Sequence, residues 1–151
     1  MIDVWTIVRF LHILGASVWM GGQLTITLVV LPPARRALSA TEAADVLAAV
    51  GRRFAVITAA VFLPVQITTG VLLAGRRGVT WSSLLQPENG YDRTLAAKLL
   101  LFALVMAAAG VHGIAQGKQR PTVARAASIT ALIGSVGVVL LATGLVEGGI
   151  G

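Results

Sequence analysis

The chain has 151 residues, of which 56% are hydrophobic and only 12% are charged, and its mean hydropathy is +0.87. A soluble domain carries about 25% charged residues, so this composition indicates an integral membrane protein surrounded by the lipid bilayer. The absence of cysteine excludes disulfides, iron–sulfur clusters and thiolate metal sites. The net charge is +6, and the basic residues fall in the loops between the apolar stretches. We interpret them as topology signals and not as a nucleic-acid-binding patch.

The first apolar stretch runs from about residue 4 to residue 31. Pro32-Pro33 follows it, and we expect these residues to end the helix because proline cannot continue the hydrogen-bond ladder. The following segment, residues 37–47, predicts a short interfacial helix with Ser39 or Thr41 as its cap.

A second apolar stretch covers residues 54–74 and contains Pro64, at which we expect a kink. Residues 75–92 contain Gly, Ser, Pro and Asn and predict a structured external loop. The third and fourth stretches cover residues 93–116 and 123–146. Each of the four is long enough to cross a hydrocarbon core of about 30 Å.

These stretches predict an all-α fold, an integral membrane four-helix bundle that forms a single domain over residues 1–151. Basic residues concentrate in the first and third connections, which favours the cytoplasmic side for them and the outer (periplasmic or extracellular) side for both termini. The aromatic residues Trp5, Trp81 and Tyr91 would gather at that outer boundary. The basic residues are Arg35, Arg36, Arg52, Arg53, Lys118, Arg120 and Arg125 in the first and third connections, against Arg76, Arg77 and Arg93 on the other side.

Lys98 is the most unusual residue of the third stretch, because it interrupts an apolar run from Leu95 to Met106. An ammonium group in hydrocarbon costs roughly 3 kcal/mol or more, so it requires a partner, a water path or a function. His12 is the candidate partner. With a rise of about 1.5 Å per residue, His12 lies roughly 12 Å and Lys98 roughly 8 Å from the outer end. His112 lies roughly 28 Å in, too deep to share one metal ion with His12.

Polar residues form a stripe on each of the first three helices, at about 100° per residue, and such stripes normally face the interior of a membrane bundle. No acidic residue lies within the four stretches, which argues against a carboxylate-based proton or cation transporter. The stripes are Arg9, His12, Trp19, Gln23 and Thr27; Thr58, Phe62, Gln66 and Thr69; and Lys98, Phe102, Val105, Ala109, His112 and Gln116.

The segment from Arg9 to Gly22 resembles the first helix of the copper-resistance protein D (CopD) family, with its histidine, a tryptophan further along and then a small-residue pair. The run Tyr91-Asp92-Arg93 before the helix with Lys98 resembles that family's tyrosine and arginine ahead of an embedded lysine. The segment from Phe54 to Gly70 is similar to its second helix.

The chain is also similar to the related HemJ proteins, membrane protoporphyrinogen oxidases thought to bind haem b, which share a Val-His-Gly like Val111-His112-Gly113. Their tyrosine–leucine–proline–arginine signature is absent between Gln23 and Pro33, so the pattern is closer to CopD. The resemblance covers about residues 4–117. It implies haem b held near His12 and Lys98, in a multi-pass protein of the bacterial cytoplasmic (inner) membrane.

Four ionisable residues have expected roles in such a site. A neutral His12 imidazole is a standard axial haem ligand. Lys98 snorkels toward the interface, ligates iron as a neutral amine, or pairs with a propionate or a substrate carboxylate. Arg9, one turn nearer the outer side, is placed to hold haem propionates. His112 is a helix-terminal histidine, a proton relay or a second metal position.

Trp19 stacks on the macrocycle or packs in the interior, and Gln66 and Thr69 form interhelical hydrogen bonds and line the site. The first hypothesis is thus a haem b protein active in electron transfer or in an oxidoreductase step on a porphyrin or quinol. The second is copper transport or resistance, with His12, Met20, Met106 and His112 along a path. The third is a non-catalytic membrane subunit or small-molecule carrier, and the oligomeric state, a homo-oligomer included, is left open.

Overall fold

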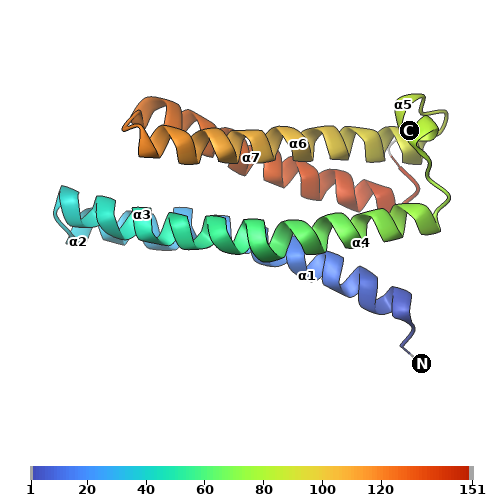
Figure 1. The fold of residues 1–151 in the computed structure, drawn as a ribbon, viewed down its shortest axis with the longest axis horizontal. Helices are drawn as coiled ribbons and strands as arrows, with labels where there is room; N and C mark the ends of the chain where they lie inside the picture. The colour runs from blue at the N-terminus through green and yellow to red at the C-terminus, as the bar shows by residue number, and fades with distance from the viewer. Residues whose placement is uncertain (1, 150–151) are drawn as a thin grey trace. The chain divides into compact units, whose positions relative to one another are not determined.

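A computed structural model describes residues 2–149, and over these residues the chain is helical without any strand. Four long helices are apolar enough to cross a membrane, which confirms the prediction of an all-α fold with four stretches of membrane-spanning length. Large apolar side chains such as Phe10 and Leu100 remain exposed, as expected for a surface that contacts lipid. The chain divides into two compact units, residues 1–77 and 78–151, here called the first and second hairpins (Figure 1).

The first long helix consists of α1 (Val4–Leu24), the π-helical segment η1 (Thr25–Val30) and α2 (Leu31–Ala37). The prediction that Pro32-Pro33 ends this helix is wrong, because the helix continues to Ala37. Both prolines lie in the first turn of α2, directly after the wider π-helical turn. Proline is tolerated in a first turn because its missing N–H is not needed there.

The second long helix consists of α3 (Ala40–Ile57), the π-helical segment η2 (Thr58–Phe62) and α4 (Leu63–Arg76). Ser39 is its N-cap, as predicted, and forms a capping box with Glu42. The predicted separate interfacial helix is wrong, since α3 runs without interruption into the span. Pro64 is again accommodated in the first turn after a π-helical segment.

The second hairpin contains the short α5 (Trp81–Leu85) and two long helices, α6 (Gly90–Gly117) and α7 (Pro121–Val146). The ends of α6 and α7 lie within three residues of the predicted ones. The two helices approach closely at Gly134, where an added Cβ would lie 2.5 Å from Val105 Cγ2. A small residue therefore lets the backbones come together, as in many membrane helix pairs.

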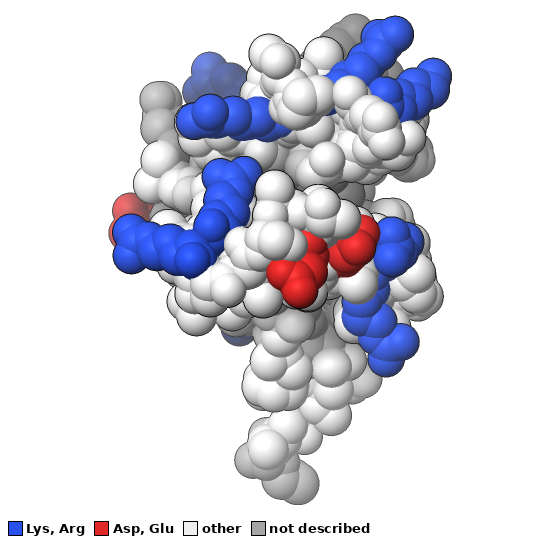
Figure 2. Space-filling model, turned by 90° about the vertical axis from the view of Figure 1, so that its left-hand side faces the viewer, with Lys and Arg blue, Asp and Glu red and all other residues white. Residues whose placement is uncertain are grey.

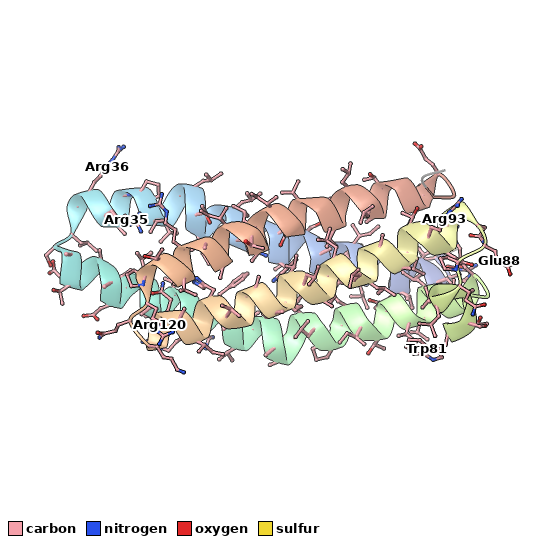
Figure 3. The ribbon with its side chains drawn as sticks, turned by 90° about the horizontal axis from the view of Figure 1, so that it is seen from above. Arg35, Arg36, Trp81, Glu88, Arg93 and Arg120 are labelled. Atoms are coloured by element: carbon pink, nitrogen blue, oxygen red, sulfur yellow. The ribbon has the colours of Figure 1, made fainter. Side chains whose placement is uncertain are left out.

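Charged side chains mark the ends of both hairpins (Figure 3). In the first hairpin, Arg35 and Arg36 project from α2 beside the turn to α3. In the second, Glu88 and Arg93 lie at the α5 end, whereas Arg120 lies at the turn between α6 and α7. Most charges of each hairpin thus lie where an apolar span stops, and Lys98, inside the span of α6, is an exception. The assignment of the termini to the outer side stays a prediction.

Candidate functional site

The candidate site lies within the first hairpin, where α1 packs against η2 and α4. His12 Nδ1 is 2.8 Å from Thr69 Oγ1. The Thr69 hydroxyl donates its hydrogen to the carbonyl oxygen of Val65 at 2.5 Å. A hydroxyl has one hydrogen, so toward His12 it accepts, and His12 Nδ1 carries the proton. In the neutral ring the lone pair is then on Nε2, the nitrogen that can bind a metal.

Gly70 has no side chain and so leaves room for the His12 ring on the surface of α4. A Cβ added at Gly70 would lie 3.3 Å from His12 Cε1, closer than ordinary contact. The imidazole therefore lies directly against the helix backbone, next to the residue that anchors its Nδ1. The pair Thr69-Gly70 supplies both the hydrogen-bond acceptor and the space.

Gln66 lies one turn before Thr69 and Gly70 on α4. Here the side chain comes from α4 and the glycine from α1, the opposite of the contact between His12 and Gly70. Its side chain lies against Gly15 of α1, where an added Cβ would be 3.5 Å from the amide carbon. Its Oε1 is buried and has no hydrogen-bond partner among the described residues. A buried amide oxygen without a donor is costly, so this atom marks a place where a donor from a ligand would be stabilising.

Trp19 of α1 and Phe62 of η2 contact each other one turn further along the same interface, here called the seam of the first hairpin. Their rings stack with centroids 4.9 Å apart and planes 12° from parallel, and both side chains are buried. The sequence placed each ring on a polar stripe but did not predict that they contact each other. One face of the indole is therefore occupied by Phe62.

Arg9 lies one turn before His12 on α1 and is exposed. Nearby at this end of the first hairpin, the Arg76 guanidinium lies 4.7 Å from the centre of the Trp5 ring, a cation–π contact between α1 and α4. Arg9 and Arg76 both lower the pKa of Asp3 through their charge, after the larger effect of the Thr6 hydrogen bonds. This end of the hairpin is therefore a cationic cluster around one carboxylate.

Lys98 and His112 both lie on α6, in the second hairpin. Lys98 is half-buried, and its pairing with His12 stays a prediction. His112 Nδ1 donates to the carbonyl oxygen of Ala124 at 2.8 Å, so it joins α6 to α7. Sequence reasoning offered other roles for His112 and did not predict this helix-to-helix bond, because a backbone acceptor has no sequence signature.

The structure thus gathers four of the predicted site residues, His12, Thr69, Gln66 and Trp19, on one seam of the first hairpin. The sequence pattern did not identify Gly15 or Gly70 as site residues, although Gly15 follows His12 by three residues and Gly70 follows Thr69 directly. Comparisons with protein-family models, with curated proteins and with solved structures found no match to this chain. The resemblance to CopD and HemJ proteins therefore rests on the motifs alone.

Proposed function

We propose that the chain is a CopD- or HemJ-like membrane protein that binds haem b, with His12 Nε2 as an axial ligand. The supporting observation is the orientation of the imidazole, whose Nδ1–H is donated to Thr69 within a membrane helix pair. A second hydrogen bond of this kind fixes the tautomer and the ring plane of most metal-binding histidines. Haem b, when bound, supplies a one-electron centre for electron transfer or for a step on a porphyrin or quinol.

The described residues fit such a group in their donor chemistry. His12 presents an imidazole with its proton on the nitrogen bonded to Thr69. Gln66 Oε1 is a buried acceptor that lacks a donor among the described residues; haem b has no donor for it, so it suits the N–H or O–H group of a porphyrin or quinol substrate. Arg9 is an exposed cation one turn away, suited to a propionate. We assign Lys98 as the second ligand or as a charge partner of the site.

We further propose that the protein resides in a bacterial cytoplasmic membrane with both termini outside. The four apolar helices support the membrane location, and the excess of basic residues in the first and third connections supports the orientation.

An absorbance spectrum of the full-length protein, purified after expression with ample haem, tests the assignment. We expect a Soret band and sharpened α and β bands on reduction, both lost in His12→Ala. Thr69→Val should weaken haem retention about 10- to 100-fold, as the loss of a residue that orients a metal-binding histidine does, while Thr69→Ser should retain it. His112→Ala is the matched control, since this histidine is held separately by Ala124, and it should keep the spectrum.

Colourless wild-type protein, or a spectrum unchanged by His12→Ala, would overturn the proposal. Bound copper without a haem spectrum would favour the copper hypothesis instead. A His12→Leu, Lys98→Leu double variant that keeps the cellular function of the protein would point to a structural subunit or carrier.

A further inference from the structure

An apolar groove of about 590 Å³ lies on the first hairpin between the first long helix and α3. Its volume falls within the roughly 300–1,000 Å³ of small-molecule sites. Three of its residues, Thr25, Ile26 and Val30, belong to the π-helical segment η1. The remaining lining residues are Gly22, Ala49, Val50, Arg53, Phe54 and Ile57.

Arg53 is the one ionisable residue in this lining. Its side chain is exposed, and it forms no ion pair within residues 2–149. The lining surface is almost entirely apolar, so Arg53 contributes its hydrocarbon part to the wall and its guanidinium lies at the edge of the groove. Such a groove is complementary to a molecule that has an apolar tail and an anionic head.

The position of Arg53 along the helix corresponds to the boundary of the hydrocarbon. From Phe54 to Gly75 the chain carries no charged residue. At about 1.5 Å per residue this stretch is roughly 33 Å long, which matches a hydrocarbon core of about 30 Å. Ile57 and Gly22 lie further from the α2–α3 turn than Arg53 does, so the deep part of the groove is at the level of acyl chains.

The charged residues on the part of the first hairpin that carries the groove are mainly basic, with two carboxylates, Glu42 and Asp45, also on α3. Arg52 is adjacent in sequence, and Arg35 and Arg36 stand on α2. Figure 2 looks onto the end of the molecule where α2 turns into α3, and it shows both basic and acidic side chains on this face. Each basic residue near an anionic membrane surface contributes about 1 kcal/mol to the attraction.

We infer that this groove binds an anionic phospholipid, with its phosphate on Arg53 and one acyl chain along Phe54, Ile57 and Gly22. The ring of Phe54 lies on Gly22, where an added Cβ would collide with it, and so forms the floor of the groove. The inference does not use His12 or any residue of the haem proposal, and either can fail without the other.

Native mass spectrometry of the full chain, with phosphatidylglycerol or phosphatidylcholine of equal chain length, tests the inference. Wild-type protein should retain one phosphatidylglycerol in preference to phosphatidylcholine. Arg53→Gln should lower that affinity about fivefold, the equivalent of about 1 kcal/mol, and Arg53→Lys should restore most of it. Arg36→Gln is the matched control, an exposed arginine on the same hairpin that lies outside the groove, and it should lower the affinity clearly less than Arg53→Gln does.

Two further measurements keep the test decisive if Arg53→Gln does not fold. Val50→Trp should reduce retention of both lipids, because the indole fills the groove. In the wild-type protein, the preference for phosphatidylglycerol should fall as salt concentration rises. Equal retention of the two lipids, unchanged binding by Arg53→Gln, or a lipid-free dimer with the groove covered by a second copy would overturn the inference.

Discussion

The His12 ring is held by two neighbouring residues of α4 that act differently. Thr69 fixes which nitrogen carries the proton, and Gly70 allows the ring to lie on the backbone. The glycine is therefore specific to this site in a way that other glycines of α4 are not. At Gly75 of the same helix, an added Cβ would meet nothing within 4 Å.

This contrast predicts a difference between two matched substitutions. Gly70→Leu should destabilise the first hairpin by about 1–3 kcal/mol relative to Gly75→Leu, since it overpacks a filled contact. The free energy of unfolding in mixed detergent micelles measures the difference. If the two variants have equal stability, the imidazole does not lie against Gly70.

The haem proposal adds a second readout for the same pair. Displacement of the ring from Thr69 should lower haem retention in Gly70→Leu, while Gly75→Leu should keep it. Loss of haem in both variants would indicate a general effect on the bundle and would remove support for a specific role of Gly70.

At the scale of elements, the cap of α1 depends on pH. Asp3 is the N-cap and accepts hydrogen bonds from the hydroxyl and the backbone N–H of Thr6, each at 2.7 Å. These bonds hold the pKa of Asp3 below its ordinary value. The cap therefore contributes its full stability above the unfolded pKa of about 3.9 and loses it as pH falls through the lower folded value.

We expect the amide proton of Thr6 to report this transition. Its NMR shift should titrate with an apparent pKa below about 3.9, and the first turn of α1 should fray on acidification. Asp3→Asn should abolish the titration and still cap the helix, because asparagine caps without a charge. A midpoint at or above the ordinary carboxyl value would contradict the assignment.

Sequence periodicity predicted the two helices of the second hairpin well, because their ends coincide with an asparagine cap, a short polar turn and a terminal glycine run. It failed at Pro32-Pro33, where the helix continues after a π-helical segment, and between residues 34 and 53, where the capping box at Ser39 starts a helix that runs on into the span. The stripe on α1 was predicted, but its packing partner was not. Periodicity identifies a face and does not say which helix covers it, so the contact of Trp19 with Phe62 and the roles of Gly70 and the Val65 carbonyl were not predicted.

At the scale of the whole molecule, the absence of cysteine makes the topology directly measurable. Single variants Ser82→Cys, on α5, and Lys118→Cys, at the α6–α7 turn, each introduce one thiol. The charge distribution predicts that an impermeant maleimide labels Ser82→Cys in intact cells and Lys118→Cys only after permeabilisation. The reverse pattern would invert the orientation and place the termini inside.

The lengths of the helices have one more consequence. The helices of the first hairpin have 34 and 37 residues, so they extend roughly 51 and 56 Å, against a bilayer interior of about 30 Å. Tilts of membrane helices reach about 40°, which absorbs only part of this excess. The tip around Leu38-Ser39 must then emerge from the membrane as a short stalk, within reach of soluble proteins and of a protease added on that side.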